Sequence, residues 1–219
     1  MTLNLFSSND NLVKEDLAPG AAILRGLAAR EDIDSQLLKA VSAIDDVAPF
    51  RHLTVPGGYS MSVGMTNCGK VGWVSDTKGY RYDAIDPLSG TKWPEMPEIF
   101  QDLAGRAAAL VGFENYRPDA CLINRYEKGA RLSLHIDKDE EDPVSPIVSV
   151  SLGIPATFLW GGYKRADKTD KLLLNHGDVV VWGGPSRMRY HGVNAIKDGY
   201  HPLTGNTRIN LTFRKVFKP

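Results

Sequence analysis

Apolar side chains recur every three or four positions in two stretches of the chain, which is the period of an amphipathic helix. The first stretch covers residues 32–47, where an aspartate at 32 or 34 is available to cap its start. The second begins near Pro94 and continues to Val111, and Gly112 is suited to end it. We expect both helices to lie against the outside of a sheet. Their apolar positions are Ile33, Leu37, Leu38, Val41 and Ile44, then Ile99, Phe100, Leu103, Ala107 and Val111.

After residue 119 the pattern changes to short runs that alternate or are rich in β-branched residues, separated by turn residues. Eight such runs at close spacing predict a β-rich fold with flanking helices, whose core is a double-stranded β-helix, or jelly roll. The runs cover residues 121–126, 130–137, 147–153, 156–160, 171–175, 178–184, 189–193 and 208–215.

Residues 49–93 separate the two helices and carry no sustained period. Glycines and scattered aromatic residues fill this stretch, so short strands and loops are expected. We therefore divide the chain into three parts: an N-terminal extension with a helix packed on the core (1–48), a separate segment (49–93), and the jelly-roll core with its supporting helix (94–219).

Composition limits the partners and the compartment. The chain has 26 Lys and Arg against 26 Asp and Glu, so a nucleic-acid partner would have to be held by local features. Cys68 and Cys121 form no CxxC pattern, which argues against a disulfide framework and a thiolate zinc site. Neither a secretion signal nor a membrane-length apolar run is recognisable, so we expect a cytoplasmic protein without a membrane or obligate protein partner.

A metal site is indicated by His135 and Asp137. They are two positions apart on a predicted strand, so both side chains point to the same face. A distant histidine would complete a 2-His-1-carboxylate site for Fe(II), and we favour His191. Taken alone the HxD triplet is weak, because a strand histidine is often only a core residue. His176 lies in a turn sequence, NHGD, and His52 and His201 have no carboxylate two positions later.

The last predicted strand carries two arginines on one face. Arg208, Asn210, Thr212 and Arg214 alternate with Ile209, Leu211 and Phe213. If the polar face points inward, the guanidinium groups need an anion, and a dicarboxylate fits because the planar forks bind carboxylates bidentately. The alternative is an edge strand whose polar face is exposed to solvent. Asn124 and Tyr126 share one face of an earlier strand and extend this polar lining.

The series NRY, HIDKDE, VVWGG, RYHG and RINLTFR resembles the bacterial members of the AlkB family over most of the chain from about residue 49. The resemblance implies an Fe(II)- and 2-oxoglutarate-dependent dioxygenase that uses O2. It implies that His135, Asp137 and His191 bind the metal and form the catalytic centre. It also implies that 2-oxoglutarate is bound by Asn124, Tyr126, Arg208, Asn210 and Arg214.

In AlkB-like proteins the segment equivalent to 49–93 looks like a substrate-recognition lid. An enzyme that acts on a base must take it out of the stack, and Trp73 and His191 could enclose the extruded base between them. Ordinary core packing is the alternative role for Trp73. By resemblance, the expected substrate contacts are Trp73, Tyr80, Arg81, Tyr82, Asp139 and Arg165. Asp139 would favour a cationic base if the strand register continues past Asp137.

The expected activity is oxidative dealkylation of N1-methyladenine and N3-methylcytosine, with succinate, carbon dioxide and formaldehyde as products. The expected partner is alkylated DNA, single- or double-stranded, with RNA left open. One alternative is a 2-oxoglutarate-dependent hydroxylase of a protein or a small metabolite. A second is a jelly-roll binding module without catalysis, which the complete ligand set and both arginines disfavour.

Overall fold

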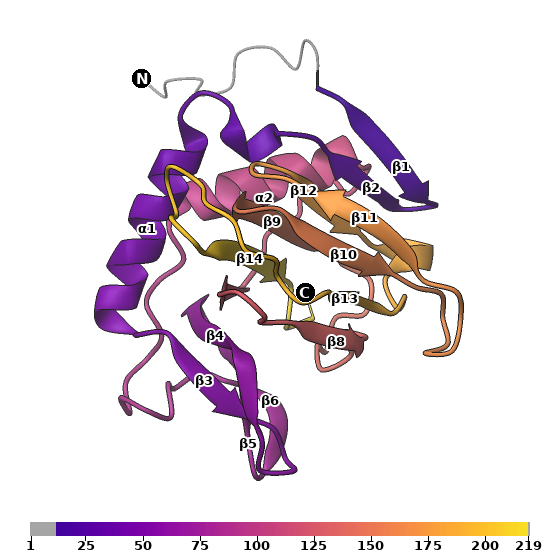
Figure 1. The fold of residues 1–219 in the computed structure, drawn as a ribbon. Coiled ribbons are helices and arrows are strands. Elements are labelled where there is room, and N and C mark those ends of the chain that lie inside the picture. Colours follow the sequence, from indigo (N-terminus) through magenta and orange to yellow (C-terminus); the bar gives the residue numbers. More distant parts are fainter. Residues whose placement is uncertain (1–11, 219) are drawn as a thin grey trace.

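The computed structural model describes residues 12–218, so residues 1–11 of the predicted N-terminal part and residue 219 lie outside the described residues. Two antiparallel sheets face each other, and two helices cover the outer face of the larger one (Figure 1). The large sheet has the strand order β1-β2-β12-β9-β14-β7-β4-β3, and the small sheet has the order β11-β10-β13-β8. A separate hairpin pairs β5 with β6.

The elements have the following bounds. The large sheet contains β1 (Lys14–Ala18), β2 (Ala21–Leu24), β3 (Arg51–Thr54), β4 (Ser60–Gly69), β7 (Ala120–Tyr126), β9 (Ile147–Gly153), β12 (Val179–Trp182) and β14 (Arg208–Arg214). The small sheet contains β8 (Leu132–His135), β10 (Ala156–Trp160), β11 (Asp170–Leu174) and β13 (His191–Val193). The hairpin consists of β5 (Gly72–Asp76) and β6 (Gly79–Asp83), and the helices are α1 (Ile33–Val47) and α2 (Glu98–Leu110).

All eight predicted runs form strands, and they divide equally between the sheets. Strands β7, β9, β12 and β14 belong to the large sheet, whereas β8, β10, β11 and β13 form the small one. This arrangement confirms the predicted jelly-roll core with flanking helices.

Alternation along each strand of the large sheet sends side chains to two different layers. In β12, Val179 and Val181 pack with the helices, whereas Val180 and Trp182 pack between the sheets. In β14 the apolar residues face the helices, and every residue of the strand is buried. Because β14 lies between β9 and β7, its polar face points into the space between the sheets, and the edge-strand alternative is wrong.

Both helices bury the predicted apolar face, but their starts differ from the prediction. Asp32 has a positive φ of 59° and makes no side-chain cap hydrogen bond. Helix α2 begins at Glu98 because Pro97 has an extended ψ of 145°, which a helix cannot include. It ends as expected: Gly112 has a φ of 94°, and the amides of Gly112 and Phe113 donate back into the last turn.

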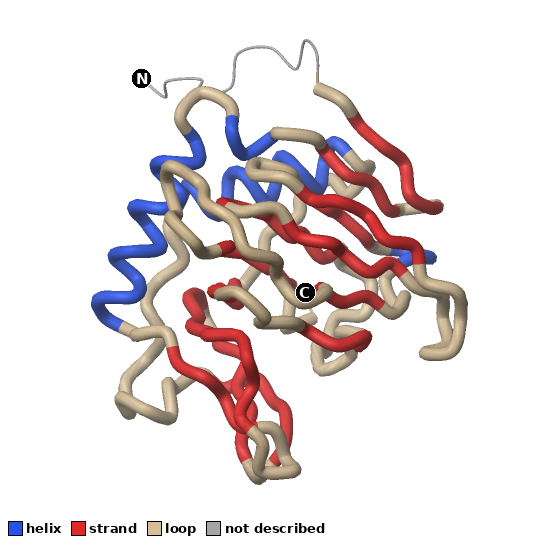
Figure 2. Tube along the Cα trace, viewed as in Figure 1, coloured by secondary structure: helices blue, strands red, loops and turns tan. Residues whose placement is uncertain are grey.

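The segment 49–93 is divided between two structures. Strand β4 pairs with β7, so it and its partner β3 extend the large sheet. Only β5 and β6 form a hairpin of their own, and the four strands project together at the lower end of the molecule (Figure 2). Trp73 therefore lies in strand β5.

Cys68 and Cys121 are directly opposite each other on β4 and β7, although they are distant in sequence. Both are buried free thiols. None of the helices in the described part of the chain is long and apolar enough to cross a membrane.

Candidate metal and cosubstrate site

The three predicted metal ligands meet at one end of the space between the sheets. His135 ends β8 and His191 begins β13, where the two residues are cross-strand partners. Asp137 lies two residues beyond the end of β8, so a loop rather than a regular strand carries it to the histidines. Each histidine Nε2 is 3.7 Å from a carboxylate oxygen of Asp137, and one ligand atom from each residue falls within 4.8 Å of the others. This donor set suits Fe(II).

Backbone carbonyls fix the orientation of both histidine rings. The Nδ1 of His135 lies 2.9 Å from the Ser133 carbonyl, and the Nδ1 of His191 lies 3.1 Å from the Arg189 carbonyl. With the proton on Nδ1, each Nε2 presents its lone pair toward Asp137. The two rings thus enter the site in the tautomer that binds a metal ion.

The charge states also suit a metal ion. Burial, reinforced by His135, lowers the pKa of His191 to about 3, so this ring is neutral at neutral pH. Burial acts to raise the pKa of Asp137, but Arg214 and the two histidines outweigh it, and that pKa lies well below its ordinary value. A neutral imidazole and a carboxylate are the forms that bind metals.

The two arginines of β14 have different environments. Arg214 donates from Nη2 and Nε to Oδ2 of Asp137, at 2.9 Å and 3.1 Å, so a carboxylate of the chain already balances its charge. Arg208 is 1% exposed, its Nη2 donates to the Ser151 hydroxyl at 2.9 Å, and its guanidinium lies over the Tyr126 ring, 5.0 Å from the ring centroid. Its Nε and Nη1 are buried and have no hydrogen-bond partner among residues 12–218. Such an arginine fits a carboxylate ligand, as 2-oxoglutarate would provide.

The other predicted cosubstrate residues surround Arg208. Tyr126 and Asn124 are the cross-strand partners of Arg208 and Asn210. Asn124 donates to Asn210 at 3.3 Å, and Asn210 donates to the Ser149 hydroxyl at 2.8 Å. The polar face predicted from alternation is therefore one continuous buried lining between the sheets.

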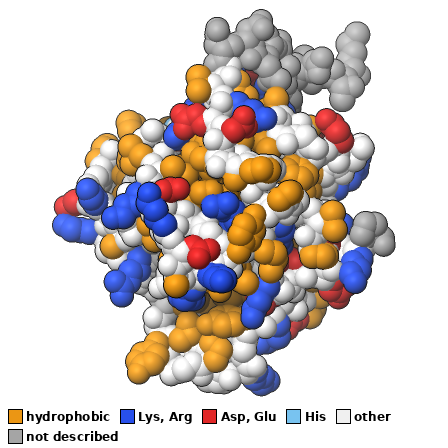
Figure 3. All heavy atoms as spheres, turned by 90° about the vertical axis from the view of Figure 1, so that its right-hand side faces the viewer, with side chains coloured by type: hydrophobic (Ala, Val, Ile, Leu, Met, Phe, Trp, Pro, Cys, Tyr) orange, Lys and Arg blue, Asp and Glu red, His pale blue; other side chains and the backbone are white. Residues whose placement is uncertain are grey.

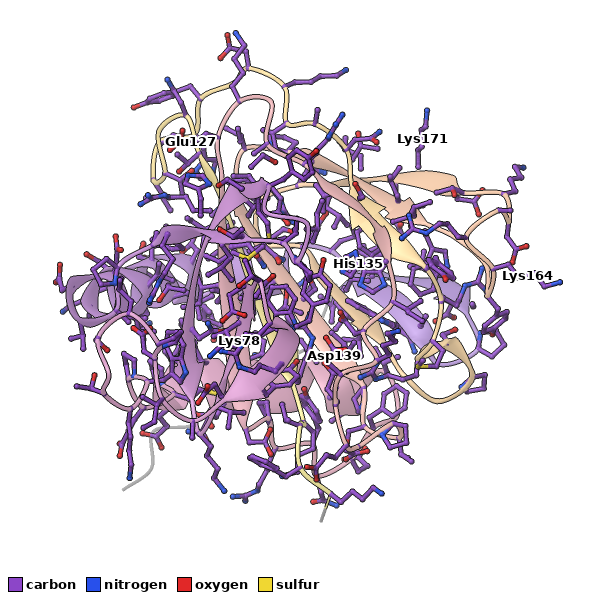
Figure 4. The ribbon with its side chains drawn as sticks, turned by 90° about the horizontal axis from the view of Figure 1, so that it is seen from below. Lys78, Glu127, His135, Asp139, Lys164 and Lys171 are labelled. Atoms are coloured by element: carbon purple, nitrogen blue, oxygen red, sulfur yellow. The ribbon has the colours of Figure 1, made fainter. Side chains whose placement is uncertain are left out.

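The hairpin carries an aromatic pair beside the metal ligands. Trp73 and Tyr80 are stacked with ring centroids 5.5 Å apart, and Trp73 Nε1 donates to Asp139 at 3.1 Å. Asp139 lies in a loop beyond the end of β8, so the register argument for it does not hold, yet the loop still brings it to Trp73. His135 and Asp139 lie near the middle of the lower face, between Lys78 and Lys164 (Figure 4).

Three other predicted substrate contacts are placed differently. Arg81 is opposite Val74 on the other face of the hairpin and pairs with Asp76 at 3.0 Å. Tyr82 donates its hydroxyl to Glu140 at 2.5 Å. Arg165 is an exposed residue of the loop after β10, with its guanidinium 5.7 Å from the Tyr190 ring. Arg81 and Tyr82 therefore contact carboxylates of the chain itself, Asp76 and Glu140.

His191 is poorly suited to be the second ring of the predicted base sandwich. It is 4% exposed, and its ring packs against Trp182 with centroids 4.8 Å apart. The His135 side chain is 31% exposed and is therefore the better candidate. His176, in contrast, has structural contacts away from the metal ligands: its Nδ1 accepts a hydrogen bond from the Gly153 amide, and its Nε2 contacts the Asp34 carboxylate.

Sequence reasoning missed Glu140 and Arg187, two buried charged residues beside the metal ligands. The Arg187 guanidinium donates to the Asp137 backbone carbonyl at 2.7 Å and to Glu140 at 2.9 Å. Glu140 belongs to the acidic run DKDEED (137–142), a pattern typical of solvent-exposed residues, and Arg187 follows the turn-like segment GGPS. Their burial becomes visible only in the fold, where the two loops meet and Arg187 pairs with Glu140.

Comparisons with known proteins agree with the Fe(II) site that the geometry of the three ligands indicates. A family model described as the 2OG-Fe(II) oxygenase superfamily matches residues 20–214. The chain is 54% identical over 205 residues to the alpha-ketoglutarate-dependent dioxygenase AlkB of Escherichia coli (strain K12), with 94% of each chain covered. It is 32% identical over 124 residues to the nucleic acid dioxygenase ALKBH1 of Homo sapiens, covering 57% of this chain and 32% of that protein. The solved structure of OsALKBH1 matches with a TM-score of 0.81 and 31% identity, covering 93% of this chain and 100% of that one.

Proposed function

Because the chain belongs to the AlkB family of 2OG-Fe(II) oxygenases, we propose that it removes alkyl groups from nucleic-acid bases by oxidation. N1-methyladenine and N3-methylcytosine are the proposed lesions. When bound, Fe(II), 2-oxoglutarate and O2 supply the oxidation of the N-methyl group, with succinate and carbon dioxide as coproducts. The hydroxymethyl group formed on the base nitrogen then leaves as formaldehyde and restores the base.

Two features together support the proposal: the metal-ligand cluster, and a buried arginine, Arg208, whose guanidinium has two nitrogens without a hydrogen-bond partner among the described residues. His135, Asp137 and His191 would hold Fe(II). Arg208 would bind the distal carboxylate of 2-oxoglutarate through the two nitrogens that lack partners. Tyr126, Asn124 and Asn210 would surround the same ligand, and Arg214 would lie toward the metal, since it already contacts Asp137.

We propose the β5–β6 hairpin as the lid that recognises the base. Trp73 would stack on an extruded base opposite the partly exposed ring of His135, with Tyr80 stacked on Trp73. Asp139, held by the Trp73 indole N–H, would place a negative charge beside a cationic methylated base. A normal base is neutral and would lack this charge–charge attraction.

The proposed partner is alkylated DNA, single- or double-stranded, and we extend the proposal to RNA because the human relative is named for nucleic acid in general. Exposed apolar side chains lie on the 49–93 segment, including Tyr59 (78% exposed), Leu88 (68%) and Tyr80 (50%). Hydrophobic side chains gather at the lower end of the face in Figure 3, below a region that also carries Lys and Arg. Arg165 would contact phosphate from the loop after β10.

The direct test is to measure succinate and formaldehyde together. The protein is incubated with Fe(II), 2-oxoglutarate and oligonucleotides that carry N1-methyladenine or N3-methylcytosine, with unmodified oligonucleotides as the control. We expect formaldehyde only with the methylated strands, in about equal amounts to the extra succinate. His135→Ala, Asp137→Ala and His191→Ala should each abolish both products, because two protein ligands hold the metal too weakly.

The same measurement distinguishes base dealkylation from the alternative activity, hydroxylation of a protein or a small metabolite. Succinate formation that never depends on the lesion would favour a hydroxylase of a protein or metabolite. Loss of turnover in His176→Ala with full activity in His191→Ala would contradict the assigned ligands.

A further inference from the structure

Four buried charged residues and one tyrosine form a continuous hydrogen-bonded network behind the metal ligands. Glu140 is at its centre, and its side chain is 3% exposed. One carboxylate oxygen of Glu140 accepts from the Tyr82 hydroxyl and lies 3.3 Å from Nε of Arg214. The other oxygen accepts from Nη2 of Arg187 at 2.9 Å.

Both arginines of the network also hold Asp137. Arg214 donates twice to the Asp137 carboxylate, and Arg187 donates to the backbone carbonyl of the same residue. Asp137 lies beyond the end of β8, so strand pairing does not determine its position. The side-chain orientation and the local backbone of this metal ligand therefore depend on Arg214 and Arg187, whose charges are balanced by Asp137 and Glu140.

Tyr82 joins this network from the hairpin. It is a residue of β6, and its strand partner is Trp73. Burial raises the pKa of Tyr82 well above its ordinary value, so the hydroxyl keeps its proton and donates to Glu140. Because this single hydroxyl is committed to Glu140, Tyr82 is poorly placed to contact a base.

We propose that Tyr82, Glu140 and Arg187 are positioning residues that fix the metal ligand Asp137 and connect its position to the β5–β6 hairpin. None of the three is a metal ligand. The connection works in both directions, since a coupling between two sites is reciprocal. The hairpin position held by the Tyr82–Glu140 hydrogen bond favours the metal-binding orientation of Asp137, and a metal ion on Asp137 favours that hairpin position.

The inference rests on the proposed function only in taking the triad as the metal site and the hairpin as the lid. Co(II) titration of the metal-free protein tests it without any dealkylation step, so failure of the proposed substrate would not affect the result. The visible spectrum of bound Co(II) reports the ligand geometry, and hydrogen exchange of the amides in residues 72–83 reports how firmly the hairpin is held in place.

Three variants make the test specific. Tyr82→Phe removes only the donor to Glu140, and we expect the Co(II) dissociation constant to rise about three- to tenfold. Glu140→Gln removes the charge that balances both arginines, and the expected rise is about 10- to 100-fold, the range for residues that orient metal ligands. Tyr116→Phe is the matched control: it also removes a buried phenol hydroxyl, but this one has no hydrogen-bond partner in the described part of the chain, so Co(II) binding should stay within about twofold of the parent.

Hydrogen exchange provides the second measurement. In the parent and in Tyr116→Phe, Co(II) should slow exchange in residues 72–83, and in Tyr82→Phe this effect of the metal should be lost. The proposal is overturned if Tyr82→Phe binds Co(II) with the parent's affinity and spectrum, or if Tyr116→Phe weakens binding as much. It is also overturned if Co(II) leaves hairpin exchange unchanged in the parent. Because Tyr82→Phe is a mild change, the test does not depend on whether Glu140→Gln folds.

Discussion

A buried arginine is costly unless an anion balances its charge, and the two arginines of β14 meet this need differently. Arg214 has Asp137 and Glu140 beside it. Arg208 has no ion pair among the described residues, and burial lowers its pKa. The difference at these two positions is the clearest residue-level sign of where an anionic cosubstrate would bind.

Arg208→Lys should raise the apparent KM for 2-oxoglutarate by about tenfold or more, because an ammonium group cannot reproduce the two-point contact of a guanidinium with a carboxylate. Steady-state kinetics with varied 2-oxoglutarate measure the effect. Arg117→Lys, a change at an exposed arginine, is the control. An unchanged KM in Arg208→Lys would place the distal carboxylate elsewhere.

Asp139→Asn should reduce kcat/KM more for cationic N1-methyladenine than for neutral N1-methylguanine in the same strand. The asparagine can still accept the hydrogen bond from Trp73, so the change isolates the charge. The ratio of the two kcat/KM values is the quantity to compare. Equal losses on both bases would leave Asp139 with a structural role only.

At the scale of elements, the β5–β6 hairpin is the part whose function depends most on its place in the fold. Two strands alone are marginally stable, and this hairpin is held by contacts with its surroundings. Asn67 on β4 bonds to the backbone of Trp73, and Tyr82 bonds to Glu140. These contacts place the Trp73–Tyr80 pair beside the metal ligands.

Trp73→Ala should weaken binding of a lesion-containing oligonucleotide by about 1 to 3 kcal/mol, the range for stacking of a base on an aromatic ring. Conversion of 2-oxoglutarate to succinate without nucleic acid should continue near the parent rate. Fluorescence anisotropy with a labelled oligonucleotide measures the binding. Tyr200→Ala removes an aromatic ring that is 75% exposed on another loop and should have no effect. Normal binding and repair by Trp73→Ala would contradict the stacking role.

For the molecule as a whole, acidification should destabilise the metal-free protein. The pKa of His191 is lowered from 6.5 to about 3 in the fold, so the unfolded chain binds an extra proton at intermediate pH. A group with a depressed folded pKa stabilises the fold above its unfolded pKa, and this contribution is lost as pH falls. Between pH 6.5 and 5.5 the expected loss from His191 is about 1 kcal/mol.

Urea unfolding in the presence of a chelator measures this loss. His191→Gln should reduce the pH dependence, and a smaller slope should remain because burial and His176 also lower the pKa of His201. His52→Gln, at an exposed histidine, should retain the full slope. A slope that is the same in His191→Gln as in the parent would show that His191 is not held neutral in the fold.

The sequence alone determined the elements and the kinds of residues in the site. Alternation over a few positions was enough to predict the eight strands and the shared face of Arg208 and Arg214. Asp137 does meet His135, but a loop beyond the end of β8 brings it there, so alternation is not the reason. These predictions succeed because the periods of helices and strands are local, so a short window of side chains reveals which face is buried.

Only the tertiary structure decided which distant groups meet. It placed β14 at the centre of the sheet, set Arg214 against Asp137, left Arg208 without a counter-ion among the described residues, and made His135 rather than His191 the exposed ring. It also joined Tyr82, Glu140 and Arg187. The physical reason is that strand order and loop paths depend on packing across the whole core, and neither leaves a periodic trace in the sequence.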